Sequence, residues 1–326
     1  MNLKTAASLI DKAFSDIIGQ KAALMRLKEI LLGGISQGSI SSTILISPPG
    51  AGKTMIMNKL KELVKKLTKR KSIFFKRGED TESREKFFES VMIKEMANQE
   101  AFVMIDEMHE TPRALQMTIR SCIEIKRGSD TEKIILGAKE FHYNPKLHSF
   151  FLATNRIDEI DPALLSRLER VDLTFYSDAE MEQILQQELR QEKIQFTDNT
   201  LRSIAECNRK SARDVLLWVK QITRYLSNRG KNTISKKDAQ EIIKSRDCYP
   251  LGLSRTELET LLFLEKRGEL QLKELACLNL CNSKEQTANE RYLIQRGLLT
   301  IMGKRILTED GTRYLKELRK EGYLSV

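Results

Sequence analysis

Hydrophobic and polar positions follow two different patterns along the first half of the chain. Short apolar runs rich in β-branched and aromatic residues are typical of buried strands, and they occupy residues 42–47, 72–76, 101–107 and 149–155. Longer runs with an apolar residue at every third or fourth position predict helices, at residues 20–35, 54–67, 82–98 and 111–125. Because strands that alternate with helices form parallel sheets, the pattern predicts an α/β domain. A projecting hairpin is expected at 123–137, where β-forming flanks surround a Gly-Ser-Asp centre.

The pattern becomes purely helical after about residue 177. Several of the helical runs begin at a Ser or Thr that can serve as N-cap, and they lie at residues 177–191, 197–208, 211–227 and 235–245. Pro250 interrupts the pattern and marks a boundary. After it come three helical runs, two β-like runs joined at Gly303, and a closing helix, which is the order of a winged helix-turn-helix. We therefore predict an α/β domain, an all-α domain and a winged-helix domain at residues 1–176, 177–250 and 251–326.

Composition and charge narrow the function classes. The chain has no uncharged apolar run long enough to span a bilayer and no apolar core of a secretory signal, so we expect a cytoplasmic protein without a membrane partner. Its five cysteines include no C-x-x-C pair, which favours reduced thiols over disulfides or a zinc site. The net charge of +10 favours a polyanionic partner, although the basic run at 59–71 is expected to be a solvated helix face.

Residues 44–57, ILISPPGAGKTMIM, place a glycine-rich turn between a predicted strand and a predicted helix. Backbone N–H groups of such a loop bind phosphates, and the helix dipole assists them. In the pattern G-x-x-x-x-G-K-[ST], Lys53 would reach the β- and γ-phosphates of ATP and Thr54 would ligate Mg²⁺. Ser47 replaces the first glycine, and we expect this small residue to be tolerated. The loop residues predicted to contact the nucleotide are Pro49, Gly50, Ala51, Gly52, Lys53 and Thr54.

Two further predicted strands end in residues suited to phosphoryl transfer. Asp106 and Glu107 end the run at 101–107, where Asp106 can hold Mg²⁺ through water and Glu107 can deprotonate the attacking water. Asn155 ends the run at 149–155, where its amide can lie between the γ-phosphate and that water. Arg167 follows shortly afterwards and is a candidate to stabilise charge on the transferred group. Since ligands of parallel sheets bind at the carboxyl ends of strands, these residues predict an ATP hydrolase.

The order of these motifs resembles that of the AAA+ ATPases, and most closely that of the RuvB family of bacterial Holliday-junction branch-migration motors. The resemblance covers nearly all of the chain from residue 14 and includes SPPGAGKT, IDEMHETPRALQ, LATNRIDEIDPALLSRLERVDL and RKSARDVL. The tail, with YLIQRGLL, GKR and TEDGTRYL, is similar to the winged-helix domain of that family. The family usually has glycine at the position of Ser47 and threonine at that of Asn155, so the chain resembles a divergent relative.

The resemblance implies further roles. Ile17 and Ile18 would line the adenine pocket, Asn155 would be the sensor 1 residue, and Arg213 the sensor 2 residue that contacts the nucleotide from the helical lid. Arg167 would be an arginine finger offered to the ATP of the neighbouring subunit, which implies a ring, usually a hexamer. The hairpin at 123–137 would match the element that docks a junction-binding adaptor protein. Activity of this type implies association with the nucleoid.

The predicted winged helix carries cations suited to contact with the DNA backbone. Its third helix and its wing supply Lys284, Arg291, Lys304 and Arg305 as candidate DNA-binding residues. Glu285 and Glu290 on the same helix argue against deep reading of base edges. The sequence therefore predicts an ATP-dependent motor that moves on duplex or branched DNA without sequence preference.

Two other functions are compatible with the same residues. An AAA+ switch of the initiator or helicase-loader type would assemble on DNA with ATP but would not translocate. An AAA+ protein remodeller would use the winged helix for protein contacts, because this fold serves both purposes.

Overall fold

The computed structural model describes residues 2–68, 71–75, 77–81, 83–87, 101–123, 132–136, 139–143, 148–197 and 200–324. The chain divides into two compact units, Met1–Tyr176 and Ser177–Val326. Within the described ranges, every helix is too short or too polar to cross a bilayer.

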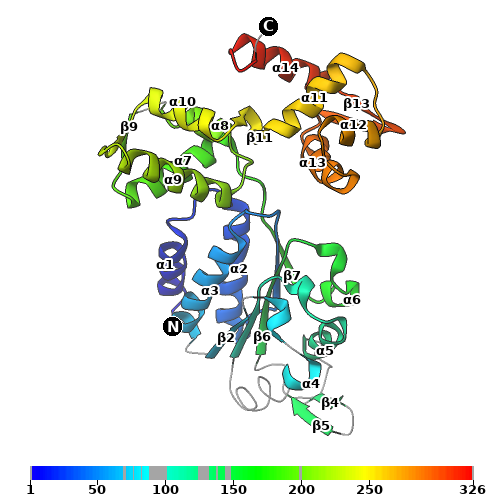
Figure 1. The fold of residues 1–326 in the computed structure, drawn as a ribbon. Coiled ribbons are helices and arrows are strands. Elements are labelled where there is room, and N and C mark those ends of the chain that lie inside the picture. The colour runs from blue at the N-terminus through cyan, green and yellow to red at the C-terminus, as the bar shows by residue number, and fades with distance from the viewer. Residues whose placement is uncertain are drawn as a thin grey trace. The chain divides into compact units, whose positions relative to one another are not determined.

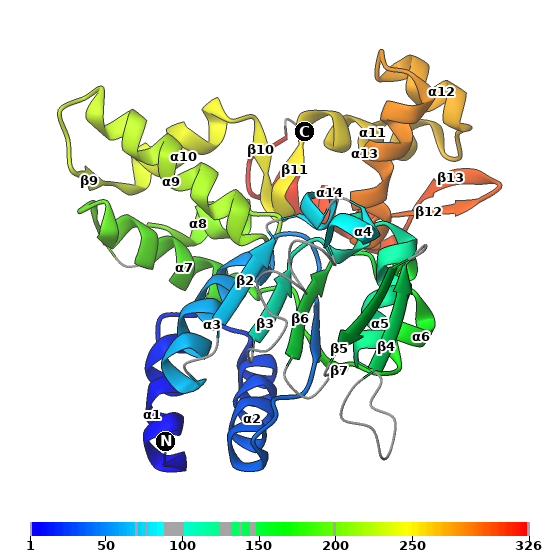
Figure 2. The same ribbon diagram turned by 90° about the horizontal axis from the view of Figure 1, so that it is seen from below.

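The first unit is built on a five-stranded parallel sheet (Figures 1 and 2). Its strands stand in the order β2-β3-β6-β1-β7, and they are β1 (Thr43–Ile46), β2 (Lys71–Phe75), β3 (Ala101–Ile105), β6 (His148–Thr154) and β7 (Glu169–Asp172). The first four were predicted because their continuous apolar runs suit strands covered on both faces. The fifth, β7, was missed, since this edge strand buries only Val171 and consists otherwise of charged residues.

Helices cover both faces of the sheet. One core joins α1 (Leu3–Phe14), α2 (Lys21–Gln37) and α3 (Lys53–Thr68) to alternate strand residues, namely Leu45, Phe102, Met104, Phe151 and Ala153. The other joins α5 (Arg113–Ile123) and the short α4 (Arg84–Phe87) and α6 (Pro162–Leu165) to the residues between them, namely Ile44, Ala101, Val103, Ile105, Phe150 and Leu152. Because side chains alternate along a strand, a single apolar run serves both cores.

The expected hairpin lies further along the chain than its prediction at 123–137. The antiparallel pair consists of β4 (Glu132–Leu136) and β5 (Lys139–Tyr143), with Leu136 opposite Lys139. Both strands contain β-forming residues, and the prediction overlooked the second because charged and polar residues flank its aromatic ones. The Gly-Ser-Asp centre at 128–130 lies outside the described residues, as does most of the helix expected at 82–98.

The second unit begins with a helical group in which Trp218 is fully buried. Its helices are α7 (Asp178–Gln191), α8 (Arg202–Glu206), α9 (Ala212–Ser227) and α10 (Lys236–Ser245). Helix α7 begins at the N-cap Ser177 and α10 at the N-cap Ser235, as expected from the sequence, and each N-cap forms a capping box. A two-residue parallel pair joins β8 (Gln195–Phe196), which follows α7, to β9 (Thr233–Ile234), which precedes α10.

The last part of the chain forms helices α11 (Arg255–Arg267), α12 (Leu272–Leu278) and α13 (Ser283–Gln295), then strands and a final helix. The strands β12 (Leu299–Met302) and β13 (Lys304–Leu307) pair antiparallel around Gly303, whose φ of 76° permits the tight turn. Helix α14 (Glu309–Lys320) then packs its apolar residues into the core of the three preceding helices.

Arg209 connects the two halves of the second unit. Its guanidinium donates to Gly252 O at 3.0 Å, pairs with the buried Glu257 at 2.5 Å, and lies over the ring of Tyr292 at 4.5 Å. Gly252 lies in the connector made of β10 (Cys248–Tyr249), the turn Pro250–Gly252 and β11 (Leu253–Ser254). These contacts explain why residues 177–326 form one compact unit although Pro250 interrupts the helical pattern.

Candidate functional site

The loop between β1 and α3 has the backbone of a phosphate-binding turn. Gly50 and Gly52 have φ values of 78° and 88°, a region that side chains disfavour. A Cβ atom on Gly52 would also lie 2.8 Å from the hydroxyl of Tyr176. Ser47 is buried and has no positive φ, so serine at this position brings no backbone strain. The loop thus keeps glycine at the two places where its conformation demands it.

The side chains that follow β1 and β3 meet at one edge of the sheet. Lys53 Nζ lies 3.2 Å from Asp106 Oδ1 and 2.9 Å from Glu107 Oε2. Thr54 Oγ1 donates to Asp106 Oδ2 at 2.7 Å. Lys53 and Asp106 are almost fully buried, whereas Thr54 is exposed. Four residues separated by about fifty positions in sequence are therefore assembled into one charged cluster.

Glu107 holds an unusual backbone conformation, with φ 50° and ψ 50°. A non-glycine residue in this left-handed region is uncommon and typical of functional sites. A Cβ atom on Gly78 would lie only 2.6 Å from the carbonyl oxygen of Glu107, so this turn requires glycine at position 78. The turn directs the Glu107 carboxylate to Lys53 instead of continuing the strand.

Asn155 lies beside the loop because of the strand register. Ile46 pairs with Thr154, and Ser47 N donates to Thr154 O at 3.1 Å, so Asn155 follows β6 next to the start of the loop. Its Oδ1 is buried and lacks a hydrogen-bond partner among the described residues. Lys53 Nζ and Glu107 Oε2 are also buried, and they contact each other as an ion pair at 2.9 Å. Buried polar atoms are nearly always hydrogen-bonded, so the unpaired Asn155 Oδ1 fits a site whose remaining partner comes from a ligand.

Three residues near the cluster were not identified from the sequence. Gln20, buried and at φ 55°, donates to Thr174 O at 2.8 Å and accepts from Thr174 N at 2.9 Å. Tyr176 donates to Ala51 O at 3.0 Å and thereby supports the loop. His109 Nδ1 lies 3.5 Å from Glu107 Oε2 and 3.1 Å from Thr154 Oγ1. Only His109 had a sequence signal, its place two residues after Glu107.

The other predicted nucleotide-site residues lie apart from this cluster in the chain. Ile17 is buried in the core of α1, α2 and α3, and Ile18 beside it is half-buried. Arg167 follows α6, and its Nη1 donates to Ala163 O at 2.6 Å, which holds the guanidinium on its own helix. Arg213 belongs to the second unit, where it is exposed in the first turn of α9. Their roles toward a nucleotide remain hypotheses.

The four cations predicted to contact DNA differ in their surroundings. Lys284 and Arg291 on α13 are exposed. Lys304 is half-buried and bonds to the exposed Glu269 at 2.5 Å, and this hydrogen bond raises the pKa of Lys304. Arg305 instead donates to Glu290, at 3.0 Å, in a pair whose carboxylate is only 1% exposed. The charge of Arg305 thus neutralises a buried carboxylate, and Glu290 does not face solvent as its place on the predicted recognition helix suggested.

We expect Arg305→Ala to lower the free energy of unfolding by roughly 3 kcal/mol, because it leaves the buried Glu290 carboxylate without its cation. The adjacent Lys304→Ala is the matched control and should leave the urea midpoint unchanged, since its ion pair is exposed. Urea unfolding of the two variants measures the difference. Equal midpoints would contradict the structural role of Arg305.

Comparisons with known proteins agree with this arrangement. Residues 43–179 match the family "ATPase family associated with various cellular activities (AAA)". The Holliday junction branch migration complex subunit RuvB of Mycoplasmopsis synoviae is 25% identical over 313 residues, which cover 93% of this chain and 95% of that protein. RuvB of Mycoplasma genitalium is 22% identical over 317 residues, which cover 93% of this chain and 96% of that protein.

A solved structure with a similar fold is the Thermotoga maritima RuvB Holliday junction branch migration motor. It superposes with a TM-score of 0.68 at 20% identity and covers 94% of this chain and 98% of that one. At this identity the likeness shows the fold alone. The fold extends over both units of the chain, beyond the part that matches the AAA family.

Proposed function

We propose that this chain, an AAA+ ATPase that resembles RuvB as a divergent relative, hydrolyses ATP to move on duplex or branched DNA. The observation that carries the proposal is the cluster of Lys53, Thr54, Asp106 and Glu107 beside the glycine-rich loop. In this proposal the Lys53 ammonium, which in the described part of the chain pairs only with the two carboxylates, would bind the triphosphate, and the unpaired Asn155 Oδ1 would accept from the attacking water.

Each residue of the cluster has a distinct role in this proposal. Lys53 binds the β- and γ-phosphates, and the loop N–H groups add further donors. Glu107 accepts a proton from the attacking water, which Asn155 helps to orient. Thr54 and Asp106, already joined at 2.7 Å, would hold Mg²⁺, which neutralises charge on the phosphate oxygens.

The nucleotide site as proposed is completed by residues outside the cluster. Ile17 and Ile18 would contact the adenine, and Arg213 would contact the phosphates from a helical lid formed by residues 177–250. Arg167 would reach the ATP of an adjacent subunit, the role that the resemblance implies for an arginine at this position. This arrangement requires a closed ring, for which we propose six subunits.

The C-terminal helices and hairpin are proposed to form a winged helix at residues 251–326 that contacts DNA phosphates. Lys284, Arg291 and Lys304 supply exposed or partly exposed cations, whereas Arg305 is excluded by its pairing with Glu290. Contacts of this kind give affinity without sequence preference, which a moving protein requires.

Arg209 would transmit motion to this DNA-binding part. The guanidinium joins the loop after α8 to the start of α11 through Glu257, so the helical group and the winged helix would move together. A change of the lid angle during ATP hydrolysis would then displace the DNA contacts. We further propose that the β4–β5 hairpin docks a junction-binding adaptor and that the protein works at the nucleoid.

The test uses purified protein, ATP, Mg²⁺ and a labelled four-way DNA junction. We expect Mg²⁺-dependent ATP hydrolysis that DNA stimulates, together with migration of the branch point. DNA affinity should fall steeply with salt, because counterion release dominates phosphate contacts. Turnover without branch movement would favour the initiator or loader type of switch. DNA binding that is absent or insensitive to salt would favour a protein remodeller.

A further inference from the structure

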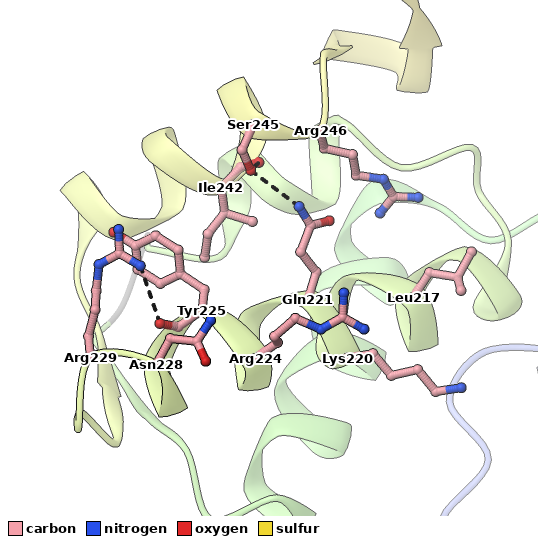
Figure 3. A pocket seen from close by; sticks show the side chains of 10 residues that line it. All are labelled: Leu217, Lys220, Gln221, Arg224, Tyr225, Asn228, Arg229, Ile242, Ser245 and Arg246. Atoms are coloured by element: carbon pink, nitrogen blue, oxygen red, sulfur yellow. Dashed lines mark hydrogen bonds between the residues drawn. The ribbon is translucent and has the colours of Figure 1, made fainter.

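The helical group of the second unit contains an open pocket of about 540 Å³ between α9 and α10 (Figure 3). One face of α9 supplies most of its wall, through residues at helical spacing, and the end of α10 supplies the rest. The lining residues are Leu217, Lys220, Gln221, Arg224, Tyr225, Asn228, Arg229, Ile242, Ser245 and Arg246.

The lining is strongly cationic and includes no carboxylate. Among the described residues, Lys220 and Arg224 form no ion pair within 4.0 Å, and both are exposed. Arg246 pairs with Asp214, which lies outside the lining, and Arg229 lies 3.8 Å from Glu241 and over the ring of Tyr225. Of the four cations in the lining, Lys220 and Arg224 therefore have no carboxylate partner in the described ranges that would compete with an anionic ligand.

The pocket also contains hydrogen-bond donors, namely two neutral amides and one guanidinium nitrogen without a partner among the described residues. Gln221 Nε2 donates to Ser245 Oγ at 3.3 Å, and the amide of Asn228 lies on the same face of α9 (Figure 3). Arg246 Nη1 is buried without a hydrogen-bond partner in the described part of the chain. A buried donor of this kind has a strong preference for an acceptor oxygen.

We propose that this pocket binds the phosphodiester backbone of DNA, as a contact separate from the winged helix; the proposal rests on the proposed function. Lys220 and Arg224 are four residues apart, which sets them about 6 Å apart along the helix axis. Charges spaced along an edge suit successive phosphates of a strand better than one small anion. Arginine and amide donors are the usual partners of backbone phosphates.

The chain's only tryptophan reports on this pocket directly. Trp218 is fully buried, and the guanidinium of Arg246 lies over its ring at 4.1 Å. A phosphate that binds Arg246 would change the electrostatic field at the indole. Trp218 fluorescence should therefore change when DNA occupies the pocket.

The experiment compares the full-length wild type with Lys220→Gln/Arg224→Gln. The control is Lys236→Gln/Lys237→Gln, which removes the same charge from exposed positions of α10 outside the pocket. Fluorescence anisotropy of a labelled DNA duplex, without nucleotide, gives affinity at several salt concentrations. Trp218 emission is recorded in the same titrations, and thermal unfolding checks that all three proteins are folded.

We expect the pocket variant to bind the duplex roughly tenfold or more weakly near 0.1 M salt, with a slope of log K against log salt smaller by roughly 2. Its Trp218 response to DNA should be lost, while the control keeps both. Unchanged affinity and slope in the pocket variant would overturn this inference and leave DNA binding by the protein intact. A wild type that binds no duplex would overturn the proposed function as well. A Trp218 response to polyglutamate but not to the duplex would refute DNA as the occupant.

Discussion

Lys53→Ala is expected to lower ATP turnover by at least about a hundredfold, because the buried ammonium group is the main cation at the proposed β- and γ-phosphate position. Binding of ATP should weaken in parallel, since the alanine variant leaves Asp106 and Glu107 as uncompensated negative charge in the same site. Steady-state phosphate release and binding of a fluorescent ATP analogue measure the two effects.

Glu107→Gln separates hydrolysis from binding at the same site. The amide keeps the size and the hydrogen-bonding reach of the carboxylate but cannot accept a proton from water. We expect turnover to fall by roughly 10²- to 10³-fold while ATP stays bound. Equal loss of binding in the two variants would show that Glu107 only positions Lys53.

Lys65→Ala is the matched control for Lys53→Ala. Lys65 lies on the same helix but is exposed, with only a 3.8 Å contact to the exposed Glu62. The Lys65→Ala variant should hydrolyse ATP at the rate of the wild type. If Lys53→Ala also hydrolyses ATP at the normal rate, the cluster is not the active site and the proposed function fails.

Arg167→Ala is expected to bind ATP normally but to hydrolyse it about 10³-fold more slowly or worse, as for other arginines supplied to a neighbouring phosphate site. The residue follows α6, away from the Lys53 cluster in sequence, and donates to Ala163 O within the same turn of the chain. Removal of the guanidinium should therefore leave the fold and the nucleotide pocket of the same subunit intact.

Mixing the two inactive variants tests whether Arg167 acts between subunits. A subunit with Lys53→Ala still offers Arg167, and a subunit with Arg167→Ala still offers a complete loop. In a mixed ring some sites combine both intact halves, so the mixture should regain ATP hydrolysis. A mixture as inactive as its components would contradict action in trans.

The neighbouring Arg170 provides a control for this experiment. It is exposed and forms a surface ion pair with Asp172 on its own strand. Arg170→Ala should keep wild-type turnover, because surface ion pairs of this kind contribute little. A loss equal to that of Arg167→Ala would indicate a general defect of this edge of the sheet.

The main elements were predictable because their signals are local. The runs that became β3 and β6 are apolar on both faces, and helices covered by water on one side keep a 3.6-residue period. The loop motif predicted Lys53 and Thr54 for the same reason, since the phosphate-binding turn is formed by consecutive residues. Edge strand β7 and strand β5 were missed because charged residues hide their pattern.

The contacts within the site were less accessible to the sequence. Gln20 and Tyr176 support the loop from more than thirty and more than a hundred positions away, respectively, and neither has a motif of its own. The left-handed conformation of Glu107 likewise comes from the packing of its turn.

The sequence by itself determined the alternation of strands and helices and the chemistry of the loop, since periodicity and closely spaced glycines act over a few residues. Only the tertiary structure decided which charged side chains form ion pairs and which of these pairs are buried. Arg305 and Lys304 are neighbours of the same sign, but one enters a buried pair and the other an exposed one. Likewise, Lys220 and Arg224 gain significance only where α10 closes a pocket against α9. Charge neutralisation depends on distances of a few ångströms between residues far apart in sequence, and folding alone sets those distances.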